Sequence, residues 1–370
     1  MRERKNNSYM KKYFQLTILL AGILLLFIIS NIFQVKSEPQ SIIATSVTPS
    51  VSEKITVTLY PTTKEIIDPY ENNSPTPKVE EVDNYINTHY SIDELKQFVL
   101  NLINADRKNA SLKPVFMDNK TAAQKHAEEM MNNKYISHWN LLGQKPYVRY
   151  SIENGTQAVA ENVALTSYYQ RDSKNLLFDA KIAIANHEYG MMYDDADWDW
   201  GHRDTILNPY HKKVNIGVAY NNETLALVQD FETDNIIWEQ LPTIQNGWIK
   251  LKGKVLEGQL YDVYIYYEKF PQSLDLGSFK EWPYNGSYSE GENVAVIIEA
   301  DHFLNNFNGR IIYSTRYNAN AGGPFEIEAY LGDWMLDYND GIYTVDVVGM
   351  MNDRKKKTLS TYSIFYNKTR

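Results

Sequence analysis

Two stretches of the sequence come close to a known metal-binding motif. Residues 187–191 (HEYGM) and 126–130 (HAEEM) each carry a methionine where the motif H-E-x-x-H needs its second histidine. That motif holds zinc through two imidazoles one helical turn apart, so the methionine removes one of the two ligands. The sequence therefore predicts no zincin-type centre in either stretch.

No other familiar nucleophile or phosphate-binding motif is present. The chain has neither a G-x-S-x-G elbow nor a P-loop, and a serine–histidine arrangement of another kind stays open. It has no cysteine, which excludes disulfides, thiolate nucleophiles, cysteine-ligated zinc and iron–sulfur clusters. The net charge of −9 and the pI of about 5.4 argue against a nucleic-acid binder, which needs a basic face.

Four ordered blocks in the middle of the chain resemble a known family. They are residues 138–140 (HWN), 160–164 (AENVA), 201–209 (GHRDTILNP) and 214–220 (VNIGVAY). Together they are similar to the CAP superfamily (cysteine-rich secretory proteins, antigen 5 and pathogenesis-related 1), and most to its cysteine-free prokaryotic SCP-type branch. The resemblance covers about residues 90–232 and implies an α–β–α sandwich with a cleft that carries a His/Glu tetrad.

Carried over onto this sequence, the tetrad implied by the resemblance is His138, Glu161, Glu188 and His202. Three of these residues lie inside matching blocks. Glu188 lies outside them: Ala185 stands where the family usually has an aromatic residue, and His187 is its direct neighbour. The residue types of this tetrad predict a metal site formed by the four residues, for zinc or another divalent cation.

The chemistry of these residue types leaves three interpretations open. Two neutral imidazoles bind zinc-like ions well and leave coordination positions for water, while carboxylates ligate directly or orient the rings. Water bound to such an ion, or a His–Glu pair acting as a general base, would support hydrolysis. The third interpretation is a polar cluster that only pins the helices to the sheet.

An acidic stretch precedes the last histidine of the tetrad. Asp195, Asp197 and Asp199 alternate as the ligands of a calcium loop do. The glycine comes one position late and the twelfth position is Ile206, so an EF-hand is excluded. We expect a solvated acidic loop that raises the local cation concentration, with a looser calcium site as the alternative.

Hydrophobic periodicity predicts the elements that must position these residues. Ser91 and Glu94 form a capping-box pattern at the start of one helix. In the second helix the residues expected to face inward are Ala122, Ala123, His126, Ala127 and Met130. The predicted helices are 91–109, about 120–133 and about 176–192, and the predicted strands are 214–220 and 225–231. We therefore expect an α+β domain over residues 86–240.

The last third of the chain, residues 244–370, is predicted to be a separate all-β domain. Seven strand-like runs separated by turn residues favour an antiparallel, immunoglobulin-like sandwich. They lie near residues 248–256, 260–267, 293–299, 310–315, 325–330, 342–349 and 359–366. Without a catalytic motif, this domain is expected to serve in adhesion, spacing, carbohydrate contact or simple structural capping.

The first residues predict a segment that targets the chain to a membrane. Within residues 1–36 a basic flank precedes an apolar run from Leu16 to Phe33, which is long enough, at about 27 Å, to span a bilayer core. We expect a single-pass transmembrane signal anchor with the later domains extracellular, and a cleaved signal peptide or a buried helix as alternatives. Residues 37–85 are rich in Ser, Thr and Pro and predict a flexible linker.

Three functional hypotheses follow from the sequence. The first is a membrane-anchored surface binding module whose His/Glu cleft takes a divalent cation and contacts a cell-envelope or surface ligand. The second is a hydrolase that acts on a peptide or a cell-envelope polymer with the same groups. The third is a scaffold with neither metal nor turnover.

Overall fold

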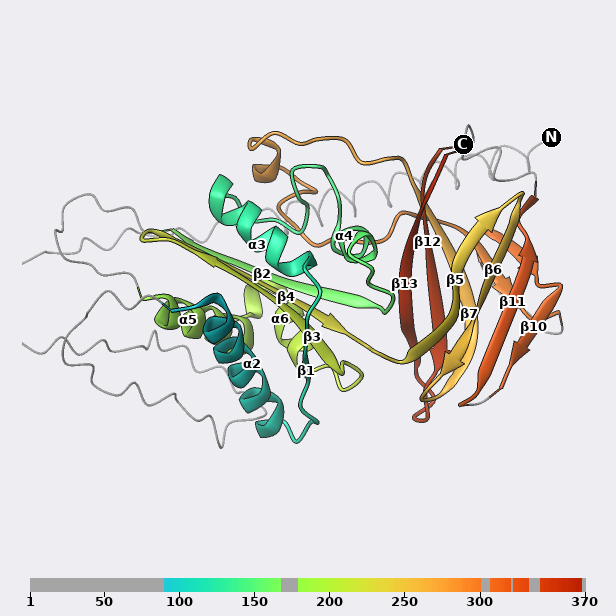
Figure 1. Cartoon of the computed structure of the whole chain (residues 1–370), viewed down its shortest axis with the longest axis horizontal. Helices are drawn as coiled ribbons and strands as arrows, with labels where there is room; N and C mark the ends of the chain where they lie inside the picture. The colour runs from blue at the N-terminus through green and yellow to red at the C-terminus, as the bar shows by residue number, and fades with distance from the viewer. Residues whose placement is uncertain (1–89, 168–178, 301–306, 321, 333–339, 368–370) are drawn as a thin grey trace, which may run out of the picture. The chain divides into compact units, whose positions relative to one another are not determined.

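The computed structural model describes residues 90–167, 179–300, 307–320, 322–332 and 340–367 (Figure 1). All of them belong to one unit of the chain, residues 62–370. The predicted membrane segment, the predicted linker and the first residues of the predicted helix 176–192 lie outside the described ranges. No helix within those ranges is both long and apolar enough to span a bilayer.

Helix α2 (Ile92–Asn109) begins at the predicted capping box. The Ser91 hydroxyl accepts from the Glu94 amide at 3.2 Å, and the Glu94 carboxylate accepts from the Ser91 amide at 2.8 Å. Arg107, fully buried near the other end of α2, donates to the carbonyls of Ile206 and Asn208 at 2.7 and 2.9 Å. Its guanidinium therefore ties α2 to the segment that carries the last tetrad block.

The predicted helices and strands of the first domain are confirmed. Helix α3 spans Ala122–Asn133 and buries the five residues expected to face inward, and α5 spans Ala180–Tyr193. Strands β3 (Lys213–Tyr220) and β4 (Thr224–Glu232) form the predicted hairpin. The structure adds β1 (Phe116–Asp118), β2 (Val159–Ser167), α4 (Pro146–Ile152), α6 (Gly201–Ile206) and the 3-10 turn η1 (Ala196–Trp198).

The first sheet has the strand order β1-β3-β4-β2 and separates two helical layers (Figure 1). The side chains of alternate β4 residues point to opposite faces of the sheet. Leu225 and Leu227 pack with residues of α2 and α5, whereas Ala226 and Val228 pack with residues of α3. The domain is therefore an α–β–α sandwich, with β2 at one edge of the described sheet.

The C-terminal region is a two-sheet sandwich. One sheet has the order β10-β11-β6-β5 and the other β13-β12-β7-β8-β9, and side chains of both sheets share one core. The strands are β5 (Ile236–Gln245), β6 (Trp248–Val255), β7 (Gln259–Glu268), β8 (Glu292–Ile298), β9 (Arg310–Tyr313), β10 (Arg316–Ala319), β11 (Pro324–Tyr330), β12 (Gly341–Met350) and β13 (Lys356–Tyr366).

Seven of these strands match the predicted runs, and three details differ from expectation. β5 and β10 were not predicted, and β5 crosses the interval between the two predicted domains. The pairing of β8 with β9 is parallel, which corrects the expectation of a wholly antiparallel sandwich. The sequence of β5 lacks a regular alternation of apolar and polar residues, because its register with β6 shifts twice along the strand.

The connection between β7 and β8, residues 269–291, lies against the α–β–α sandwich and includes the 3-10 turn η2 (Ser278–Lys280). The backbone amide of Leu274 donates to the carbonyl of Leu141 at 2.8 Å, and Phe279 stacks on Tyr135 with ring centroids 4.0 Å apart. We call residues 269–291 the β7–β8 segment. It joins the two sandwiches through both backbone and side-chain contacts.

Candidate functional site

His138 and Glu161 form a direct pair. His138 follows helix α3, and Glu161 lies in the edge strand β2. Nδ1 of the histidine ring is 2.9 Å from Oε1 of Glu161, whose side chain is fully buried, while 16% of the histidine side chain is exposed. The structure therefore brings these two predicted site residues together at the edge of the sheet.

Arg149 holds both members of this pair. Helix α4, with Pro146 in its first turn, directs the Arg149 side chain toward β2. One terminal nitrogen donates to Oε2 of Glu161 at 2.5 Å, and the other donates to the carbonyl of His138 at 2.6 Å. Because both carboxylate oxygens of Glu161 are engaged, the imidazole of His138 has a fixed orientation.

The charge of Glu161 is set by these neighbours. Burial alone would raise its pKa, but the Arg149 guanidinium and the hydrogen bond from His138 outweigh burial and lower the pKa to about 2. Asp230, its register partner in β4, shows the opposite shift: burial, and then the charge of Glu161, raises its pKa well above the usual value. Glu161 is thus the charged carboxylate of this buried pair, and Asp230 keeps its proton.

His202 is held by a carboxylate that the resemblance does not imply. Asp195 places Oδ1 at 2.6 Å from Nδ1 of the His202 ring, and its Oδ2 accepts the backbone amides of His202 and Arg203 at 2.9 and 3.1 Å. Asp195 therefore both satisfies the first amides of α6 and orients the imidazole. The expectation of a solvated loop is wrong for this buried residue, although Asp197 and Asp199 are exposed.

Glu188 lies in helix α5 and forms no hydrogen bond with the ring of His138 or of His202. Its Oε2 accepts from the Gln229 amide at 2.7 Å, and its Oε1 has no hydrogen-bond partner among the described residues. Burial, followed by the charge of Asp106, raises the pKa of Glu188 to about 8. The neighbouring His187 is held separately, with its Nε2 2.6 Å from the Thr166 hydroxyl.

Strand β2 is the element that connects the tetrad. Glu161 and Asn162 are consecutive, so their side chains point to opposite faces of the sheet. Glu161 holds His138, while the Asn162 amide donates to the His202 carbonyl at 3.2 Å and to Oε1 of Gln229 at 3.3 Å. The four predicted residues thus form one direct pair and one indirect network on either side of β2.

Within the described ranges, no group of three or more histidine and acidic side chains is arranged to hold a metal ion. Each of the two imidazoles, His138 and His202, is nevertheless held in the way that a metal-ligating histidine is held. Both rings are held through Nδ1 by a buried carboxylate, and in the described part of the chain neither Nε2 makes a hydrogen bond. Nε2 is the nitrogen that such carboxylate–histidine pairs present to zinc.

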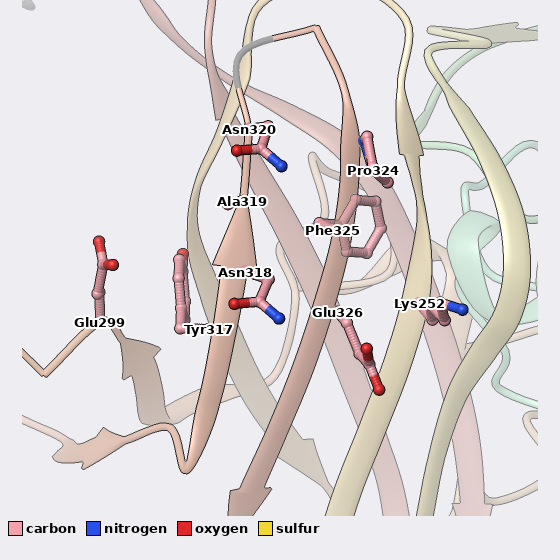
Figure 2. Close-up of a pocket in the computed structure, with 9 residues that line it drawn as sticks. All are labelled: Lys252, Glu299, Tyr317, Asn318, Ala319, Asn320, Pro324, Phe325 and Glu326. Carbon is pink, nitrogen blue, oxygen red and sulfur yellow. The ribbon is translucent and has the colours of Figure 1, made fainter.

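Two pockets lie away from these residues. One of about 480 Å³ is on the C-terminal sandwich (Figure 2), and one of about 370 Å³ adjoins the start of α2. Figure 2 shows Tyr317, Asn318 and Asn320 along one strand and Phe325 with Glu326 along its neighbour. Neither of the two pockets includes a residue of the predicted tetrad.

A further buried carboxylate on the Glu161 face of the sheet supports a prediction about pH. Burial and the nearby Asp118 raise the pKa of Glu232 to about 7, against about 4.3 for an unfolded glutamate. The folded state then holds a proton that the unfolded state releases, so this stabilisation is complete below about pH 4.3 and is lost as the pH rises through 7. We expect Glu232→Gln to lessen the fall in unfolding free energy between pH 5 and pH 8.

Urea unfolding at each pH unit measures this effect. The matched control is Glu292→Gln, at an exposed position of β8. It should leave the pH dependence unchanged. Parallel curves for Glu232→Gln and the wild type would show that Glu232 does not titrate in this window.

The geometry defines a class of domain: a cysteine-free α–β–α sandwich with two carboxylate-held histidines beside an edge strand. Residues 100–231 match the family model described as "CAP: Cysteine-rich secretory protein family". This part of the chain is therefore a CAP domain, as its four sequence blocks indicated. No curated protein matches the chain.

Solved structures with related domains are similar to part of this chain. An extracellular SCP-domain protein of Bacillus anthracis is 21% identical, covering 39% of this chain and 44% of its own, with a TM-score of 0.29. The CAP domain of enterococcal PrgA is 16% identical and covers 40% of this chain and 64% of its own, with a TM-score of 0.28. An outer surface protein of Borrelia burgdorferi is 16% identical and covers 40% of this chain and 98% of its own, also with a TM-score of 0.28. This chain thus spans less than two thirds of the length of the first two proteins.

Three residues around the candidate site were not predicted from the sequence. Arg149 lies in a helix of seven residues, which is too short to show periodicity. In the sequence, Asp195 is one member of an acidic run, and its position seven residues before His202 is the one signal of its role. Tyr288 comes from the β7–β8 segment and packs against His138, and no local pattern connects it to the CAP domain.

Proposed function

We propose that this protein is a membrane-anchored, outward-facing CAP-domain binding module that holds a divalent cation, such as zinc, between His138 and His202. The single observation that carries the proposal is that a buried carboxylate engages Nδ1 of each imidazole. The apolar run from Leu16 to Phe33 supports the anchor, and the strand pattern of residues 244–370 supports an immunoglobulin-like second domain.

The tautomer of each neutral ring follows from its hydrogen-bond partner. Glu161 is ionised, because Arg149 and His138 lower its pKa, so it can only accept a hydrogen bond. Nδ1 of His138 therefore carries the hydrogen, and the lone pair of a neutral ring lies on Nε2. Asp195 accepts two backbone amides through Oδ2 and faces the His202 ring through Oδ1, which favours the same tautomer there.

Both imidazole side chains are partly exposed. The side chains of His138 and His202 are 16% and 21% exposed, whereas their carboxylate partners are buried. A bound cation would supply an electrophilic anchor for an oxygen group of a surface or cell-envelope ligand. The chain's own contribution is to hold both rings in the ligating tautomer.

A hydrolase is the second candidate, favoured by the His138–Glu161 pair itself. A histidine whose Nδ1 is held by a buried carboxylate has the arrangement of a general base that takes a proton at Nε2. The substrates that fit the proposed location are peptides and cell-envelope polymers. This alternative predicts turnover that depends on the pair, with or without a cation.

Zinc titration of the full chain by calorimetry tests the cation site. We expect one zinc per wild-type chain and at least about 100-fold weaker binding in the His138→Ala/His202→Ala double variant, because both ligating nitrogens are gone. His187→Gln is the control, since its ring is held by Thr166 and glutamine keeps a hydrogen-bonding group there.

Equal zinc affinity in the wild type and the double variant would contradict the proposal, provided that thermal unfolding shows both proteins folded. A screen of peptide and glycan substrates, with and without chelator, then separates the two candidate functions. Turnover that is lost in His138→Ala would favour the hydrolase. Cation binding without turnover would favour the binding module.

A further inference from the structure

The β7–β8 segment is built into the core of the CAP domain. Phe279 is only 6% exposed and lies in the same apolar cluster as Ala127 and Met130 of α3 and Val228 of β4. Its ring is nearly parallel to that of Tyr135, with an interplanar angle of 12°. A segment that contributes a buried aromatic ring to this core is a structural part of the CAP domain, although its residues come from the C-terminal region.

Polar contacts fix the course of the segment along the chain that leads to and from His138. The Ser137 hydroxyl donates to the Tyr284 carbonyl at 2.5 Å, and Lys145 donates to Glu268 at 2.6 Å, where the segment leaves β7. At Gly143, with φ +73°, an added Cβ would lie 2.4 Å from the carbonyl oxygen of Gln272. The two backbones are therefore in close contact at Gly143 and Gln272.

Tyr288, near the end of the segment, reaches the candidate site itself. Its ring packs edge-on against the imidazole of His138, with centroids 4.9 Å apart and an interplanar angle of 62°. Its hydroxyl accepts the backbone amide of Glu161 at 3.2 Å. That amide belongs to the edge strand β2, so the tyrosine satisfies a group that the described sheet leaves unpaired.

These contacts act on both members of the pair. The hydroxyl holds the backbone of Glu161, and the ring limits the tilt of the imidazole that the Glu161 carboxylate engages. Burial, and then the nearby charge of Glu161, raises the pKa of Tyr288, so its hydroxyl stays protonated beside the carboxylate. A neutral side chain can stay at this position without adding a second negative charge.

We propose that Tyr288 is a positioning residue for the His138–Glu161 pair, and that the C-terminal β domain thereby completes the site of the CAP domain. Its effect on cation affinity rests on the proposed function, whereas its effect on the His138 ring does not. The second domain would then act at the site, beyond spacing or adhesion.

Histidine-labelled NMR spectra of the full chain in detergent micelles read the ring directly, and His138→Ala assigns its resonances. Tyr288→Leu removes both the ring and the hydroxyl, so we expect the carbon-bound protons of His138 to lose their ring-current shift. Tyr288→Phe keeps the ring and should retain that shift. Trp282→Ala is the control, because this side chain lies in the same segment and is 83% exposed.

Zinc titration of the same proteins gives the second readout. We expect affinity to fall about 10-fold in Tyr288→Leu, as for the loss of an outer-sphere partner of a ligating histidine, and to be largely restored in Tyr288→Phe. Gly143→Ala, which displaces the segment at Gln272, should reproduce the His138 shift change without altering Tyr288 itself. It serves as the second route if Tyr288→Leu does not fold.

The outcomes separate the two proposals. Unchanged His138 resonances in folded Tyr288→Leu, or in Gly143→Ala, would overturn the positioning role. Altered resonances together with no zinc binding in the wild type would support the positioning role and reject the cation site. Altered resonances with weakened zinc binding would support both.

Discussion

Replacing Arg149 with methionine is expected to lower the free energy of unfolding by about 3–5 kcal/mol. The guanidinium donates at 2.5 Å to Glu161, whose carboxylate is fully buried and charged. Methionine fills similar space but leaves that charge with the His138 ring as its remaining side-chain donor. It also removes the side-chain donor that serves the His138 carbonyl at 2.6 Å and one of the two donors of the Gln144 carbonyl, which keeps the Asn140 amide.

A double-mutant cycle separates the charge from the packing. Since a neutral amide costs less to bury than a carboxylate, Arg149→Met/Glu161→Gln should be more stable than Arg149→Met by at least about 1 kcal/mol. Urea unfolding of the wild type, the two single variants and the double variant at pH 7 gives the coupling energy between Arg149 and Glu161. If the second substitution adds its full cost to the first, Arg149 is not neutralising Glu161.

Gly217→Ala is expected to destabilise the protein by about 3 kcal/mol, near the upper end for an overpacked core. Gly217 is in β3, and an added Cβ would lie 2.1 Å from the carbonyl oxygen of Ala123 at the start of α3. The atoms in the way belong to the helix backbone, so no side-chain rotation relieves the clash. The helix that leads to His138 would have to move away from the sheet.

The matched control is Gly190→Ala in helix α5. A Cβ there meets no atom within 4 Å, and alanine favours the helix, so this change should stabilise the protein by roughly 0.5–1 kcal/mol. Thermal and urea unfolding test whether Gly217→Ala lowers the free energy of unfolding and Gly190→Ala raises it. Gly217→Ala with wild-type stability would show that α3 and β3 approach less closely than the structure has them.

Local signals predicted much of the CAP domain. The Ser91–Glu94 capping box and the spacing of the apolar residues are properties of a single helix, so α2 and α3 were found with nearly correct bounds. Strand β2 was missed because two consecutive residues in its first half, Glu161 and Asn162, are polar although both are buried. A strand whose burial is balanced by ion pairs and hydrogen bonds has no apolar alternation to detect.

The candidate site was only partly predictable for the same reason. The sequence blocks identified His138, Glu161 and His202, but the groups that hold them come from other elements. Arg149 reaches Glu161 from α4, and Tyr288 reaches it across 127 residues of chain. Their roles depend on tertiary packing, which no spacing along the sequence encodes.

The dependence of Glu161 on Tyr288 has a consequence for how the protein is made. The two residues are 127 positions apart, so at typical rates of synthesis the tyrosine is added on the order of ten seconds after the glutamate. During that interval the nascent CAP domain lacks Phe279, and the apolar surface that this ring covers is open to solvent or to chaperones. A messenger truncated before β7 would therefore yield a product with a permanently uncovered surface, and cellular quality control would be expected to remove it.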